Sequence, residues 1–170
     1  MRKIIFVLLI AFSLNLNAQI QRSFYGFSLG KTTKKEVVSY FKSRKMKIWN
    51  NDTNRLSVRS LNFGGYKWPV VYFNFYKNKL YLIYFSDAEY FTPRQSLDTK
   101  WKDLEVSLMS KYRNFIVNEE NTEEYHKFID HSQTSLIFKY DYYEGYKGIA
   151  LMYTDLKLQY EQYLSEKSEL

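Results

Sequence analysis

Cysteine is absent from this sequence, and proline and glycine are scarce, with two and six residues among 170. Without cysteine the chain can form no disulfide, use no thiol nucleophile and offer no thiolate to a metal. The low glycine and proline content excludes collagen-like and low-complexity chains, and the 19% aromatic content excludes an intrinsically disordered one. We therefore expect a single domain that its hydrophobic core stabilises.

The N-terminus has the three parts of a secretory signal peptide. Arg2 and Lys3 form the basic region, residues 4–14 form an apolar run, and Ala18 is a small residue at the cleavage point. The run is shorter than the about 20 apolar residues that a membrane-spanning helix needs, and no later stretch qualifies. We predict cleavage after Ala18 and a periplasmic or secreted protein, residues 19–170, without a cysteine for lipidation and without a transmembrane segment.

The predicted mature chain remains basic, because removal of residues 1–18 lowers the formal net charge only from +7 to +5. Basic residues concentrate between Lys31 and Lys47, where Glu36 is the single acid. Such a segment can bind anionic lipid headgroups or nucleic acid, but the solvated face of an amphipathic helix is the expected reading. Export also disfavours nucleic acid, so no nucleic-acid partner is predicted.

Two helix starts are marked by capping motifs. Thr33 is followed three residues later by Glu36, and Thr92 by Gln95 with proline between them, so each pair can satisfy free amides at a helix end. The second helix also has an apolar stripe at helical spacing. The stripe consists of Leu97, Trp101, Leu104, Leu108 and Tyr112.

The two helices divide the chain into two similar blocks, because alternating hydrophobic strands and turns follow each of them. We predict one α+β domain made of two tandem helix-plus-antiparallel-strand repeats, about residues 24–87 and 88–154, with the helices packed on one face of the sheet. Asp155 can cap a C-terminal helix over about residues 155–167.

Hairpin register predicts which side chains share a face, because side chains alternate along a strand. Pairing of Tyr76 with Lys79 and of Tyr143 with Tyr146 would give each hairpin one hydrophobic face, which should meet the helices. In the first hairpin this face is Val71, Phe73, Phe75, Leu80, Leu82 and Tyr84. In the second hairpin it is Leu136, Phe138, Tyr140, Ile149, Leu151 and Tyr153.

The opposite face of the first hairpin is aromatic, and it is the predicted partner-binding surface. Its composition is typical of protein-interface hot spots. The candidate residues are Trp68, Tyr72, Tyr76, Tyr81, Ile83 and Phe85. A loop, the C-terminal helix or a second copy of the chain could instead cover this face, and the sequence leaves the oligomeric state open.

Signals for catalysis are weak. The only two histidines, His126 and His131, lie near Asp130, but no familiar zinc-ligand spacing is present and a solvated loop is the expected reading. No nucleophile elbow, phosphate-binding loop or dinucleotide fingerprint occurs. We predict no catalytic residue, no metal ligand and no cofactor, and keep a metal-dependent hydrolase around His126, Asp130 and His131 as an alternative hypothesis.

The opening Phe24-x-Gly26-x-x-x-Gly30-x-Thr32, followed by the helix segment 36–38 and antiparallel strands, resembles the superfamily that holds the beta-lactamase inhibitory protein and the BamE-type assembly lipoproteins. It looks most like the small exported Gram-negative members. The resemblance implies a tandem helix-plus-sheet fold whose sheet presents a binding surface, with no known catalysis. The lipidation cysteine of BamE-type proteins is absent and no inhibitory loop can be matched, so no functional residue is carried over.

These patterns favour an exported, non-enzymatic binding or envelope-associated module whose aromatic sheet face engages a protein partner. A glycan-binding module is the second hypothesis, because tyrosine and tryptophan stack on sugar rings while their polar tips form hydrogen bonds.

Overall fold

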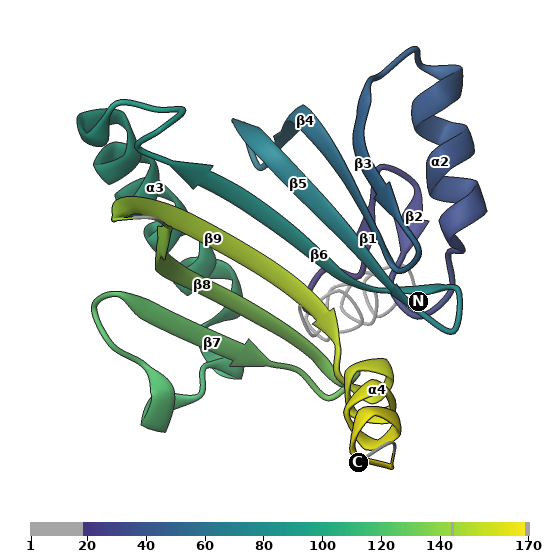
Figure 1. The fold of residues 1–170 in the computed structure, drawn as a ribbon. Helices are drawn as coiled ribbons and strands as arrows, with labels where there is room; N and C mark the ends of the chain where they lie inside the picture. The colour runs from purple at the N-terminus through teal and green to yellow at the C-terminus, as the bar shows by residue number, and fades with distance from the viewer. Residues whose placement is uncertain (1–18, 144, 169–170) are drawn as a thin grey trace, which may run out of the picture.

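The computed structural model describes residues 19–143 and 145–168 (Figure 1). The predicted signal peptide, residues 1–18, lies outside the described residues. The helices are α2 (Lys34–Ser43), α3 (Arg94–Tyr112) and α4 (Leu156–Ser168), with short 3-10 turns at Arg113–Phe115 and Asn118–Glu120. The strands are β1 (Ser23–Phe24), β2 (Phe27–Ser28), β3 (Ile48–Asp52), β4 (Arg55–Phe63), β5 (Tyr66–Tyr76), β6 (Lys79–Ala88), β7 (Tyr125–Ile129), β8 (Thr134–Tyr143) and β9 (Tyr146–Asp155).

Seven strands form one antiparallel sheet in the order β3-β4-β5-β6-β9-β8-β7, and β1 pairs with β2 in a separate hairpin. Strands from the two predicted blocks meet in the middle of the sheet, where β6 pairs with β9. Figure 1 shows the two blocks as one continuous, twisted sheet. The predicted α+β class is confirmed.

The main core lies between one face of the sheet and the elements that cover it. Phe41 of α2 packs on Phe73 with ring centres 5.4 Å apart, and Trp101 of α3 stacks on Phe138 at 4.1 Å. Phe24 of the β1–β2 hairpin is buried in the same core. In Figure 1, α3 and this hairpin lie behind the sheet. All five residues of the predicted α3 stripe are buried, as their spacing indicates.

The two predicted capping motifs have different outcomes. Thr33 and Glu36 form a complete capping box at the start of α2. At the start of α3, Pro93 occupies the cap position and makes no side-chain hydrogen bond to the helix. The Thr92 hydroxyl donates instead to Oδ1 of Asp87 at 2.7 Å. The predicted Thr92 cap is wrong because the Thr92 hydroxyl binds a buried carboxylate and is therefore not placed at the helix end.

Asp155 begins α4, as predicted, because its Oδ1 accepts a hydrogen bond from the Leu158 amide at 3.1 Å. Its Oδ2 forms an ion pair with Arg22. Gly30 lies against this pair, with a φ of 77° and no room for a side chain, since a Cβ there would approach Asp155 Oδ2 to 2.6 Å. The start of α4 is thereby joined to the N-terminal segment.

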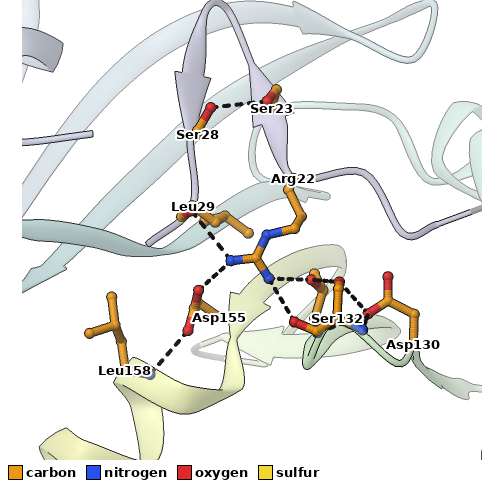
Figure 2. Close-up of polar contacts among 9 residues, drawn as sticks. Arg22, Ser23, Ser28, Leu29, Asp130, Ser132, Asp155 and Leu158 are labelled. Atoms are coloured by element: carbon orange, nitrogen blue, oxygen red, sulfur yellow. Dashed lines mark hydrogen bonds and ion pairs between the residues drawn. The ribbon is translucent and has the colours of Figure 1, made fainter. Parts of the chain in front are cut away.

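Arg22 holds the N-terminal segment on the domain through several hydrogen bonds (Figure 2). Besides Asp155, its guanidinium donates to Thr134 Oγ1 at 2.6 Å, to the Ser132 carbonyl at 3.2 Å and to the Leu29 carbonyl at 3.3 Å. The planar guanidinium group of arginine carries five N–H donors, so it can bind several acceptors at once. One side chain therefore connects the β2 end, the β7–β8 turn and the start of α4.

Candidate functional site

The predicted partner surface is changed by a β-bulge in the first hairpin. Pairing at the turn is as predicted, but an extra residue on β6, Tyr81, shifts the register by one. A one-residue shift exchanges the two faces of a strand. Beyond the bulge Ile83 and Phe85 point into the core and are fully buried, whereas Leu82 and Tyr84 lie on the other face. The predicted faces are wrong for these four residues.

Trp68 is also a core residue and not a surface residue. Its side chain is fully buried, its ring lies 5.5 Å from that of Phe85, and its indole nitrogen donates to the Phe63 carbonyl at 3.1 Å. Strict alternation would place Trp68 and Val71 on opposite faces, yet both are buried in the same cluster. Ser60, on β4 opposite this part of β5, has a φ of 60°. The regular β4–β5 pairing is therefore interrupted at this point, and the side chains of β5 change faces there.

Tyr76 and Tyr81 lie next to α4 at one end of the sheet. The Tyr76 hydroxyl donates to the Glu161 carbonyl at 3.3 Å. Burial raises the pKa of Tyr81, and a hydrogen bond with Gln162 partly offsets that rise. Three of the six predicted surface residues are therefore core, two contact α4, and only Tyr72 remains on the uncovered part of the face.

The face of the sheet opposite the main core is called here the open face. Among the described residues, α4 contacts it only at the end that holds Tyr76 and Tyr81, and Figure 1 looks onto the rest of it. Its centre is a row of four half-exposed side chains from adjacent strands. These are Tyr72 of β5, Tyr84 of β6, Met152 of β9 and Ile137 of β8. Around them lie Arg55, Arg59, Leu82, Lys139 and Asp141.

Two tyrosines fix the geometry at the centre of the open face. Tyr72 and Tyr84 stack with ring centres 5.5 Å apart, and the guanidinium of Arg55 lies 4.0 Å from the Tyr72 ring centre. The Tyr84 hydroxyl donates to Asp141 Oδ2 at 2.6 Å, and Lys139 contacts Oδ1 of the same carboxylate at 3.2 Å. Burial, aided by the Asp141 contact, raises the pKa of Tyr84 well above its usual value.

Stacking of a sugar on Tyr72 would require rearrangement. Arg55 comes from β4 on one side of β5, and Tyr84 comes from β6 on the other side. Both flanks of the Tyr72 ring are therefore occupied by side chains of the protein itself. At the centre of the open face, the Tyr72 ring is therefore accessible at its edge and hydroxyl group more than on its flat sides. This arrangement suits contact with a protein surface better than stacking on a sugar ring.

The second hairpin follows its predicted pattern. Tyr143 pairs with Tyr146, and the register continues without a bulge along both strands. The residues of its predicted hydrophobic face are buried in or packed against the main core, and Trp101 of α3 stacks on Phe138 and on Tyr140.

The structure does not assemble the hypothetical metal site. The two ring nitrogens of His126 lie 2.8 Å from Glu105 Oε1 and 2.5 Å from Asn121 Oδ1, so neither is free to bind a metal. Asp130 accepts hydrogen bonds from the Ile20 amide and from its own turn, while His131 is exposed. Over the described residues, no group of three or more potential ligands could hold a metal ion.

A hollow of about 420 Å³ lies between the start of α3 and the sheet. At its base Lys100 Nζ forms a buried ion pair with Asp87 Oδ2 at 2.9 Å and lies 3.6 Å from the Trp68 ring centre. Burial lowers the pKa of Lys100, while Asp87 opposes that change. Asp87 also accepts a hydrogen bond from the Thr92 hydroxyl, and Lys100 also donates to the Lys67 carbonyl. The charged groups of both side chains are therefore bound within the protein, where they hold α3 on the sheet.

No protein-family model, curated protein or solved structure matches this chain. The resemblance to the superfamily of the beta-lactamase inhibitory protein therefore stays a prediction. Within the described residues, the structure contains no helix long and apolar enough to cross a membrane.

Proposed function

We propose that this protein is an exported binding module and that the open face binds a protein partner. The observation that carries the proposal is the central row, in which Tyr72, Tyr84, Met152 and Ile137 lie side by side on four adjacent strands and are half exposed. Aromatic residues and methionine are enriched in protein interfaces, together with arginine.

Rigidity of the row supports the same function. The Tyr84 hydroxyl is held by Asp141, and the Tyr72 ring lies between Tyr84 and Arg55. Side chains that are already ordered lose little conformational entropy when a partner binds. The row is therefore arranged as a preformed binding centre.

Charges at the margin indicate the chemistry of the partner. Arg55 and Arg59 are exposed on β4, and Lys139 is half exposed on β8. Asp141 is the acid nearest the row and is already paired with Lys139 and Tyr84. A partner with an apolar centre and an acidic rim would complement this surface and associate faster at low salt.

Site-specific photo-crosslinking tests the proposal. A photoreactive phenylalanine analogue replaces Tyr72 in one variant and Val106 in a control variant, and both are exposed to extracts of the source cells. Val106 is 68% exposed on α3, far from the open face in the fold. We expect a discrete crosslinked product from position 72 that is absent from position 106 and that is lost when Met152→Lys is added.

Identical products from positions 72 and 106, or none from position 72 while the variant remains folded, would contradict this assignment. Export is tested separately, by mass spectrometry of the N-terminus of protein made in the source organism. Cleavage after Ala18 is expected, and an intact N-terminus would oppose export by this route.

A further inference from the structure

A second surface lies at the end of the sheet near the turn between β5 and β6. There the chain segment before α2 pairs with that turn, since Thr33 forms a bridge with Lys79 and the Leu80 amide donates to the Thr32 carbonyl at 2.8 Å. A hollow of about 190 Å³ joins the same turn to the start of α4. The fold thus brings three segments that are far apart in the sequence to one place.

Six lysines gather on these three segments, and we call them the lysine end. They are Lys31, Lys34, Lys35, Lys77, Lys79 and Lys157. All except Lys34 are exposed. Lys77, Lys79 and Lys157 line the hollow directly.

The acids near the lysine end are few and mostly paired. Glu161 binds Lys77 at 3.3 Å, Asp155 binds Arg22, and Glu36 is used in the capping box of α2. Within the described residues, Lys31, Lys35, Lys79 and Lys157 form no ion pair with an acid. The lysine end therefore carries an excess of positive charge that suits an anionic partner.

The outward face of α4 continues this surface with apolar groups. Leu158, Glu161 and Gln162 face the domain, so the residues at the opposite helical positions point away from it. Tyr160, Tyr163 and Leu164 are 61%, 49% and 47% exposed. By helical spacing Lys167 lies on this outward face, and Lys157 lies at its edge, beside the hollow.

Tyrosine is enriched at membrane–water interfaces, where its ring lies at the level of the lipid headgroups, and lysines nearby can bind anionic headgroups. With 13 residues, α4 is too short to cross a bilayer. We propose that α4 and the lysine end together bind the surface of an anionic lipid bilayer, with Tyr160, Tyr163 and Leu164 in the headgroup region. Exposed apolar groups favour a lipid surface over double-stranded nucleic acid, whose phosphate backbone would contact the lysines alone.

Vesicle flotation tests this proposal without reference to the open face. The full chain is expressed, its N-terminus is determined, and binding is measured to phosphatidylcholine vesicles with and without phosphatidylglycerol. We expect binding only with phosphatidylglycerol, and a steep loss as salt is raised. Lys79→Glu with Lys157→Glu should weaken binding by roughly ten-fold or more.

The matched control is Lys102→Glu with Lys111→Glu, because both lysines are exposed on α3 and the net charge changes equally. The control should retain most of the binding. A second pair of variants tests the apolar contribution without a change of charge: at low salt, Leu164→Ser should weaken binding, whereas Val106→Ser should not.

Absence of binding to phosphatidylglycerol vesicles at low salt would overturn the proposal. Equal losses in the two charge-reversal variants would also overturn it, since they would reflect net charge alone. Binding to DNA with the same affinity and the same loss on Lys79→Glu with Lys157→Glu would show a general polyanion site in place of a lipid surface. Because these variants leave Tyr72 and Met152 unchanged, their results are independent of the crosslinking test.

Discussion

The hydroxyl group of Tyr84 on β6 binds the carboxylate of Asp141 on β8 across the intervening strand β9, at 2.6 Å. Tyr84 pairs directly with Met152, and Asp141 pairs with Gly148. On the same face of the intervening strand β9 stand Gly148 and Ala150, which carry no side chain larger than a methyl group. This contact ties together the two halves of the chain on the open face.

Removal of that hydroxyl should be measurable. Tyr84→Phe is expected to lower the free energy of unfolding by about 1–2 kcal/mol, because a charge-assisted hydrogen bond is lost at a partly buried site. Tyr142→Phe is the control, since Tyr142 is 61% exposed, and should change stability little. Denaturant unfolding measures both, and equal effects would argue against a special role for the Tyr84 contact.

The corrected faces of the first hairpin predict losses of stability of very different size for two residues that the sequence placed on one face. Phe85→Ala should cost about 3–5 kcal/mol, because a fully buried aromatic ring leaves a cavity. Tyr72→Ser should cost much less, because its ring is half exposed on the open face. Unfolding curves of the two variants test the register, and similar costs would contradict the bulge at Tyr81.

Loss of one partner of the buried ion pair between Lys100 and Asp87 should be severe. Asp87→Ala leaves Lys100 buried and unpaired, and is expected to destabilise the fold by about 3–5 kcal/mol. Asp103→Ala, which removes the exposed acid that binds Tyr66, should cost under about 1 kcal/mol. Replacing the pair together, with Lys100→Met and Asp87→Leu, should recover part of the loss in a thermal melt.

Stability should fall at alkaline pH because several tyrosines are buried. Burial raises the pKa of Tyr140 to about 12 and raises the pKa of Tyr84 and Tyr153 further. The unfolded chain loses these protons near pH 10, so stability that is complete below pH 10 is lost as the pH rises toward the folded-state values. Unfolding free energies from pH 9 to 11 measure the slope, which Tyr140→Phe should reduce; an unchanged slope would exclude Tyr140 as a contributor.

Arg22 should control how firmly the N-terminal segment is held. Arg22→Met removes the ion pair with Asp155 and three further donor contacts (Figure 2), and a loss of about 2–3 kcal/mol is expected because Asp155 is left buried. Amide hydrogen exchange should increase first at Ile20 and Leu29. Uniform increases over β8 and β9 instead would mean that the segment and the sheet unfold as one unit.

Local chemistry in the sequence determined the starts of α2 and α4 and the α3 stripe. The Thr33 capping box, the Asp155 cap and the five apolar residues from Leu97 to Tyr112 depend on neighbours within a few positions along the chain. The pairing of Tyr143 with Tyr146 was equally accessible, because a tight turn and regular alternation specify it. These features made the α+β class predictable.

Only the tertiary structure decided which face of the first hairpin is open. The bulge at Tyr81 exchanges the faces of β6, and the distortion near Ser60 turns Trp68 into the core, although the residue types alone fit either face. The contact between Tyr84 and Asp141 and the gathering of Lys31, Lys79 and Lys157 depend on strand order and on the placement of α4. Such relationships join residues dozens of positions apart, and no local preference specifies them, because their energies arise from packing between elements.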